Sequence, residues 1–97
     1  MLILWSLHAR QDLLEILAYF MSLEDVETGK SIVSRIILSV DRLAEYPLSG
    51  RQGRIAGTRE ILVRNLPYLL VYRNSPQSVE IARVFHTSKL FPESLER

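Results

Sequence analysis

Apolar residues recur at two different spacings along this chain, and the change of spacing separates a helical part from a strand-forming part. Residues 2–5 form a short apolar run typical of a strand, and Ser6 follows as a candidate helix N-cap. The apolar positions that come next fall at helical spacing on one face and predict a helix over about residues 7–21, namely Leu13, Ile16, Leu17 and Phe20.

A second amphipathic run follows a polar segment at residues 22–25. Its apolar stripe repeats at helical spacing and consists of Ile32, Ile36, Val40 and Leu43, widened by Ile37 and Ala44. Gly29 costs about 1 kcal/mol relative to alanine in a helix, so we expect the first turn to fray. Pro47 pushes Tyr46 out of the helical region and ends the helix. The short connection between the two helices predicts an antiparallel hairpin.

The spacing then changes to that of strands. Residues 47–58 are rich in glycine and polar side chains and are predicted to form a loop. Three strand-like segments follow, at 59–64, 68–73 and 79–85, with turns between them. The predicted fold is therefore α+β, in the order β-α-α-β-β-β, with an N-terminal strand and a helical hairpin packed on an antiparallel sheet.

Length and composition limit the classes of protein to consider. With 97 residues, of which 47% are hydrophobic, the chain is expected to fold as a single globular domain over residues 1–97. It has no cysteine, which excludes disulfides, thiolate zinc sites and a cysteine nucleophile. The apolar runs are far shorter than the roughly 20 residues that span a bilayer, so we expect a cytoplasmic protein without a membrane partner. No pattern in the sequence indicates a cofactor.

Charge is distributed unevenly although the net charge is only +1. Residues 1–50 carry four basic and seven acidic side chains, a net of −3, whereas residues 51–97 carry eight basic and four acidic ones, a net of +4. This asymmetry indicates either a second half that faces an anionic partner or an ordinary solvated basic surface.

The strongest basic feature is the glycine- and arginine-rich stretch at 50–60. Its spacing fits neither a P-loop nor a dinucleotide fingerprint. Arg51, Arg54 and Arg59 could present planar guanidinium groups to phosphate or to another target. The alternative is a solvated loop that only connects the second helix to the sheet.

Arginines also occupy the predicted strands. Arg83 falls on the same side of an unbroken strand as Val79, Ile81 and Phe85. It either faces a partner, together with Arg59 and Arg73, or forms an ion pair with Glu60 or Glu80 across the sheet.

His86 ends the last predicted strand and is either a candidate for general acid–base chemistry or a structural histidine with its hydrogen bonds satisfied within the fold. By strand alternation it points away from the face that carries Arg83, so a site using both requires a bulge. Tyr68 and Tyr72 share one side of their strand and are expected in the core or at its rim, or stacked on a base.

Some groups of polar residues suggest no chemistry. The two histidines are far apart and the carboxylates do not cluster, so no metal site is predicted. Asp12 and Glu15 lie off the apolar face of the first helix and are expected to be solvated.

Together these segments resemble the RelE/ParE superfamily of bacterial toxins from type II toxin–antitoxin systems. The resemblance lies in the order and spacing of short segments along nearly the whole chain. These are Trp5, Ala9, Asp12-Leu13, Ile16 and Tyr19; Leu43-Ala44-Glu45-Tyr46-Pro47 with Gly50-Arg51; Thr58-Arg59-Glu60-Ile61; Tyr68 with Val71-Tyr72-Arg73; and Val79-Glu80-Ile81, Val84, His86, Lys89 and Pro92.

The resemblance implies a toxin held inactive by a cognate antitoxin, and two kinds of target. RelE-like members cut ribosome-bound mRNA, and the residues here that would serve as a nuclease set are His86, Arg59, Arg83 and Arg73. ParE-like members poison DNA gyrase without that catalytic set. Arg51, Arg54, Tyr68, Tyr72 and Lys89 would then contact the target or its phosphates. A module of the same fold without toxicity is a further alternative.

Two departures favour the ParE-like branch. The lysine-rich loop typical of the ribosome-dependent nucleases is replaced here by the arginine–glycine loop, and Lys89 stands where the family pattern has arginine. Lysine cannot make the bidentate phosphate contact that arginine makes.

Overall fold

The computed structural model describes residues 1–89 and 91, which form two helices and five strands. The elements are β1 (Leu2–Trp5), α1 (Leu7–Ser22), α2 (Val26–Glu45), β2 (Arg51–Gln52), β3 (Arg59–Leu62), β4 (Tyr68–Asn74) and β5 (Ser78–His86). The predicted α+β order is confirmed. The prediction missed β2, a two-residue strand inside the expected loop, because so short a pairing leaves no periodicity to detect.

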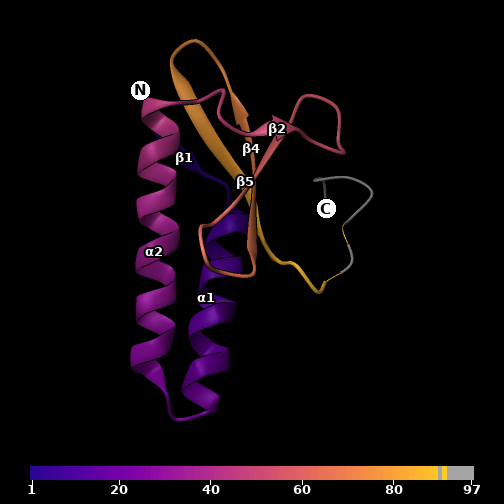
Figure 1. Cartoon of the computed structure of the whole chain (residues 1–97). Coiled ribbons are helices and arrows are strands. Elements are labelled where there is room, and N and C mark those ends of the chain that lie inside the picture. Colours follow the sequence, from indigo (N-terminus) through magenta and orange to yellow (C-terminus); the bar gives the residue numbers. More distant parts are fainter. Residues whose placement is uncertain (90, 92–97) are drawn as a thin grey trace.

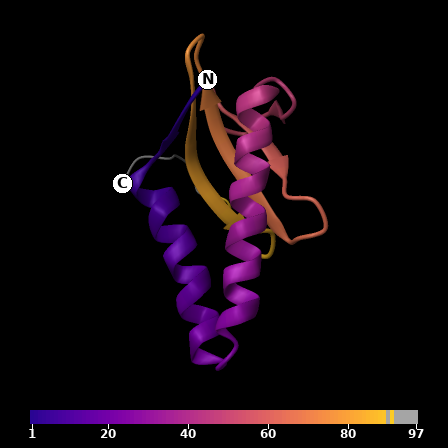
Figure 2. The same cartoon turned by 90° about the vertical axis from the view of Figure 1, so that its left-hand side faces the viewer.

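The strands form one sheet in the order β1-β5-β4-β3-β2. Neighbouring strands are antiparallel except for β1, which lies parallel to β5. The predicted antiparallel arrangement of the last three strands is confirmed, and the parallel β1 makes the whole sheet mixed. No tight turn connects β1 to β5, so the local sequence does not fix their relative direction. Both helices lie on one face of the sheet, and the turn between them projects beyond its end (Figures 1 and 2).

The main core lies between this helical hairpin and the sheet. Ile36, Val40 and Leu43 of the predicted α2 stripe are buried there, against a set from the sheet that includes Leu70, Tyr72, Val79 and Ile81. The expected widening of the stripe is wrong for Ile37, which is 42% exposed. Tyr68 and Tyr72 share the helix-covered side of β4, as strand alternation predicted.

Two residues near the helix N-termini determine how α1 begins and how closely α2 packs on it. The Ser6 hydroxyl caps α1 by accepting from the Ala9 amide at 3.0 Å, which confirms the predicted cap. Gly29 is buried in the first turns of α2, and a Cβ there would lie 3.0 Å from the Cβ of Phe20. The helix is already formed at Gly29, so the expected fraying is not observed. The glycine instead has a packing role, because its missing side chain lets α2 approach α1 closely.

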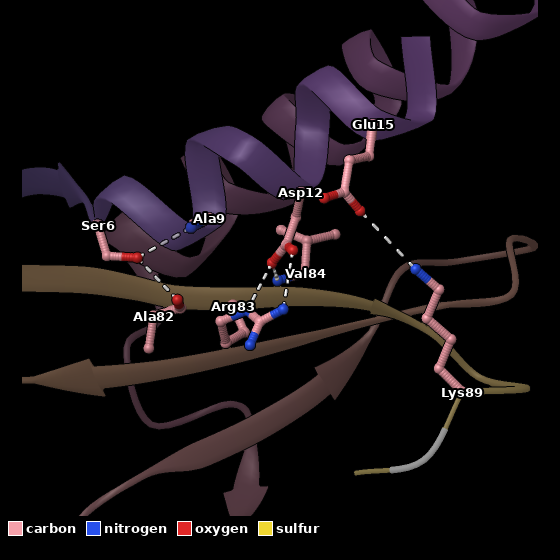
Figure 3. A network of polar contacts seen from close by, with 8 residues as sticks. All are labelled: Ser6, Ala9, Asp12, Glu15, Ala82, Arg83, Val84 and Lys89. Atoms are coloured by element: carbon pink, nitrogen blue, oxygen red, sulfur yellow. Dashed lines mark hydrogen bonds and ion pairs between the residues drawn. The ribbon is translucent and has the colours of Figure 1, made fainter. Parts of the chain in front are cut away.

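The edge of β5 beyond β1 is closed by α1 (Figure 3). The β1 pairing ends at Ile81, and the Ser6 hydroxyl then donates to the Ala82 carbonyl at 2.7 Å. One oxygen of Asp12 accepts from the Val84 amide at 2.8 Å. Asp12 is only 8% exposed, so the expectation that it is solvated was wrong. A buried carboxylate here replaces the missing neighbouring strand.

Asp12 also holds the Arg83 guanidinium by two hydrogen bonds, from Nε at 2.9 Å and from Nη2 at 3.0 Å. This contact raises the pKa of Arg83 above its ordinary value. Arg83 is therefore in an ion pair, but with α1 and not with Glu60 or Glu80 across the sheet.

A bulge in β5 decides which way Arg83 points. Val71 pairs with Arg83 and Tyr72 pairs with Ile81, so Ala82 is an extra residue in β5. Ile81 therefore packs in the helix-covered core, whereas Arg83 lies over the Phe85 ring on the opposite side of the sheet. The prediction that Arg83 shares a face with Val79 and Ile81 assumed an unbroken strand and is wrong.

Replacing Asp12 by alanine should lower the free energy of unfolding by about 2–4 kcal/mol, because it leaves the Val84 amide and the Arg83 guanidinium without their partner. Chemical denaturation followed by circular dichroism measures the change. The control is Glu15→Ala, one turn further along α1, where the exposed carboxylate makes a weak ion pair with Lys89 at 3.9 Å. This variant should change the free energy of unfolding by less than about 0.5 kcal/mol. Equal midpoints for the two variants would contradict the edge-closing role of Asp12.

Candidate functional site

The arginine–glycine loop begins at a fixed point on the sheet. The buried Tyr72 hydroxyl accepts from the Gly50 amide at 2.9 Å and donates to the Pro47 carbonyl at 2.8 Å. A Cβ on Gly50 would lie 2.6 Å from that hydroxyl, so only glycine fits. Arg59 donates from Nη1 to the Gly50 carbonyl at 2.7 Å. Tyr72 and Arg59 thus position the loop, and Tyr72, with no exposed surface, offers no ring face to a base.

Glu60 organises the arginines of this loop. Its carboxylate, 1% exposed, accepts from Arg51 Nη2 at 3.0 Å and from the Arg54 amide at 2.9 Å, and Arg54 Nε lies 3.5 Å away. Burial by itself would raise the pKa of Glu60, but the Arg54 amide and the two guanidinium groups outweigh it and lower the pKa below the ordinary 4.5. One carboxylate therefore holds two cationic side chains in place.

The arginines line a hollow on the face of the sheet opposite α1 and α2, which we call the basic pocket. It has a volume of about 210 Å³. The basic pocket is lined by Arg51, Arg54, Leu62, Leu69, Phe85, His86, Thr87, Lys89 and Phe91. Leu69 and Phe85, together with Val71 and Phe91, make a second small apolar cluster, so the hollow has an apolar floor and a cationic rim.

Two guanidinium groups lie against the aromatic floor. Arg54 stacks over Phe91 and Arg83 over Phe85, each with its central carbon 4.4 Å from the ring centroid. The two rings also contact each other, at 5.4 Å between centroids. These stacked pairs fix the arginines and shield the ring faces that they cover.

His86 ends β5 opposite Tyr68 in the β4–β5 ladder, and its ring lies edge-on to the Tyr68 ring at 5.3 Å, on the helix-covered side of the sheet. Its Nδ1 accepts from the Ser88 amide at 3.1 Å and lies 2.7 Å from the Ser88 hydroxyl. Because an amide can only donate, the neutral imidazole carries its proton on Nε2. Burial, with a smaller contribution from Tyr19, raises the pKa of Tyr68, which keeps its hydroxyl protonated.

Two other hollows flank the sheet on its helix-covered side. One, of about 240 Å³, lies between α1 and the end of β5 and is lined in part by Glu15, Tyr19 and His86. The larger, of about 390 Å³, lies between α2 and β3, with Tyr46 and Ile61 among its lining residues. Neither gathers as many cationic groups as the basic pocket.

The predicted nuclease set does not meet at one point. Arg83 is held by Asp12, Arg59 donates to the Gly50 carbonyl, and Arg73 lies 3.5 Å from Glu80. In the ladder Arg59 is opposite Tyr72 whereas His86 is opposite Tyr68, which separates them by about 13 Å along β4. The residues that do share a site with His86 are Arg51, Arg54 and Lys89 of the predicted target-binding set.

Sequence reasoning missed Glu60 and the apolar floor. Glu60 alternates with Arg59 and Ile61 in a strand, so nothing in the pattern marks it as buried. The floor did have a signal: residues 68–72 are apolar without alternation, which indicates a strand covered on both faces. Pro92, quoted for the family resemblance, lies outside the described residues.

Among the described residues, no helix is both long and apolar enough to cross a bilayer, and no three metal-binding side chains gather into a ligand set.

Glu60→Gln should lower the free energy of unfolding by about 1–3 kcal/mol at pH 7, because it weakens the contacts of Arg51 and Arg54. The folded-state pKa of Glu60 is depressed, so its contribution is complete above the ordinary 4.5 and is lost as the pH falls through the folded-state value. Urea denaturation of both proteins at pH 7 and pH 3 should therefore show the gap closing in acid. Glu80→Gln, at an exposed carboxylate, is the control and should stay close to wild type. A gap of constant size at both pH values would contradict this account.

Comparison with known proteins places these features in a family. The family model described as "ParE toxin of type II toxin-antitoxin system, parDE" matches residues 3–91. A relative from Sinorhizobium fredii, described as "Putative toxin Y4kP", is 44% identical over 91 residues, which are 94% of this chain and 93% of that protein. A solved structure titled "Chromosomal ParDE TA system from P. aeruginosa" superposes with a TM-score of 0.79 at 23% identity, over 89% of this chain and 95% of that one, and so shares the fold. The chain therefore belongs to the ParE toxin family of type II toxin–antitoxin systems, and its partner is an antitoxin protein.

Proposed function

We propose that this toxin acts in the bacterial cytoplasm and stops growth by binding and poisoning DNA gyrase, without performing chemistry of its own. The observation that carries the proposal is the dispersal of the nuclease set. Arg59, Arg73 and Arg83 each have a partner within the chain, at separate places on the sheet.

Cleavage of RNA by its own 2′-hydroxyl needs a base at that hydroxyl and cations at the phosphate, arranged around a common point. Here Arg83 is tied to the buried Asp12, and Arg59 is used to hold the start of the loop. Releasing either arginine for catalysis would leave a buried partner unsatisfied. The ParE family match and the resemblance of this branch to gyrase poisons support the same conclusion.

Binding, in contrast, needs only an accessible and pre-organised surface. Arg51, Arg54 and Lys89 are between 57% and 65% exposed at the rim of the basic pocket. Glu60 fixes the two arginines, which reduces the entropy lost when they contact a target. We assign these three side chains to the contact with gyrase.

A second function, cleavage of ribosome-bound mRNA, is favoured by one observation. His86 and Lys89, at the end of β5, line both the hollow beside α1 and the basic pocket, so a histidine stands next to Arg51 and Arg54. In that case His86 would move the proton and the three cations would hold the phosphate.

Two assays on the purified chain separate these functions: inhibition of gyrase supercoiling and cleavage of ribosome-bound mRNA. We expect supercoiling to be lost with mRNA intact, and His86→Ala to retain at least half of the inhibition. Arg51→Gln, which leaves both Arg54 contacts on Glu60, should weaken gyrase inhibition about tenfold. Its control is Arg73→Gln, an exposed arginine at the far end of β4, which should inhibit like wild type.

Cut mRNA with normal gyrase, abolished by His86→Ala, would replace gyrase poisoning by the nuclease function. A chain that leaves both targets and bacterial growth unaffected would be a non-toxic module of the same fold, and the proposed function would fail.

A further inference from the structure

The hollow between α2 and β3, which we call the α2–β3 hollow, has the size of a small-molecule site. Its volume of about 390 Å³ falls within the roughly 300–1,000 Å³ usual for sites that enclose a small organic ligand, whereas the basic pocket, at about 210 Å³, is smaller. The residues that give it its chemistry are Ser39, Arg42, Leu43, Tyr46, Ile61 and Arg64.

The α2–β3 hollow has cationic walls. Arg42 lines it from the last turn of α2, and Arg64 lines it from the turn after β3. Among the described residues, neither guanidinium group forms an ion pair with a carboxylate. The acidic residues on this part of α2, Asp41 and Glu45, do not line the hollow. An anion placed there would therefore meet two arginines whose charge is not already paired.

Helical spacing and one backbone contact fix the two arginines on opposite walls. Ser39, Arg42 and Tyr46 are three and four residues apart, so they lie on one face of α2. Arg35, one turn before Ser39, donates from Nη2 to the Arg64 carbonyl at 3.0 Å. This bond ties the segment that carries Arg64 to α2, and it uses the carbonyl of Arg64 and not its side chain.

The hollow also presents an aromatic ring beside an apolar wall. Tyr46 is 63% exposed, and in the described part of the chain no guanidinium group or second ring lies against it. Phe85 and Phe91 differ in this respect, because arginines cover them. Leu43 and Ile61 form the apolar wall, where α2 meets the sheet. A planar ring of a ligand can therefore lie against Tyr46 and the apolar wall.

We propose that the α2–β3 hollow binds a free nucleotide, with its base against Tyr46 and its phosphate between Arg42 and Arg64. An uncovered ring, an apolar wall and two unpaired arginines meet in one hollow of suitable volume. This inference goes beyond the proposed function, because the α2–β3 hollow uses none of the three cations that we assign to gyrase.

The direction of α2 sets the orientation of the nucleotide. The C-terminus of a helix carries a partial negative charge that disfavours an anion, and this effect falls off within the last turn. α2 ends at Glu45, so phosphate is disfavoured beside Tyr46, whereas Ser39 lies before the last turn. We expect the phosphate at the Ser39 end of the hollow, where the Ser39 hydroxyl can donate to it, and the base at the Tyr46 end.

The hollow suits one nucleotide better than a nucleic-acid strand or an acidic peptide. Single-stranded nucleic acids bind along several aromatic side chains, on which successive bases stack. Tyr46 is the one aromatic side chain among the described residues that line the hollow, which provides for a single base. The carboxylates of an acidic peptide could pair with the two arginines, but they would leave the ring of Tyr46 unused.

Calorimetric titration of adenosine monophosphate (AMP) into the full chain tests the proposal. We expect saturable binding, at least tenfold tighter than that of adenosine, which lacks the phosphate, or of inorganic phosphate, which lacks the base. Tyr46→Leu should weaken AMP binding at least fivefold, and Arg42→Gln/Arg64→Gln at least tenfold. Both variants keep the bond from Arg35 to the carbonyl of residue 64, and circular dichroism verifies their fold.

The matched control is Lys30→Gln/Arg73→Gln, which removes the same charge from exposed ion pairs outside the hollow and should bind AMP like wild type. Equal losses for the two double variants would reduce the effect to net charge and overturn the proposal. Equal affinity for AMP and adenosine, or for AMP and inorganic phosphate, would also overturn it, because the phosphate or the base would then contribute nothing.

A twelve-nucleotide single strand separates a free nucleotide from a nucleotide within a polymer. Tighter binding of the strand than of AMP, weakened by the same substitutions, would overturn the proposal in favour of a nucleic-acid site. Absence of saturable AMP binding by a chain that still inhibits gyrase would overturn this inference alone. AMP binding by a chain without effect on gyrase would leave it standing and remove the gyrase target.

Discussion

The fold depends on how the open edge of β5 is closed. β1 pairs with only part of that strand, and a carboxylate of α1 completes the edge by accepting from Val84 and holding Arg83. The same contact fixes the angle at which α1 leaves β1 and keeps Arg83 over Phe85. Through one buried Asp12, the helical layer and the floor of the basic pocket are therefore set together.

A second buried carboxylate has a comparable role at the other edge of the sheet. Glu60 draws Arg51 and Arg54 onto β3 and gives the loop a definite shape. Each acidic side chain thus takes arginines that the charge pattern would otherwise leave free. The arginines held by Glu60 stay exposed at the rim, whereas Arg83, held by Asp12, is largely enclosed. This difference separates the cations available to a partner from those that stabilise the fold.

The sequence predicted the parts of this structure that depend on local periodicity. Helical spacing located both helices, and the Ser6 cap and Pro47 marked their ends. What it missed depends on distant contacts. The burial of Asp12 follows from a strand 72 residues later, and the orientation of Arg83 follows from a one-residue bulge that has no sequence signature of its own. The site was predicted in part: Arg51, Arg54, Lys89 and His86 line one pocket, while the buried Glu60 that orders the two arginines carries no periodic signal.

Closing the fold from its two ends has a consequence for synthesis on the ribosome. β1 pairs with β5, and Ser6 and Asp12 bond to Ala82 and Val84, over separations of 76 and 72 residues. Such a high contact order means that β1 has no partner strand until β5 has emerged. The nascent toxin therefore stays without its finished core, and without the floor of the basic pocket, until residues 78–86 have been synthesised. That interval gives an antitoxin already present in the cell time to meet the chain as it folds.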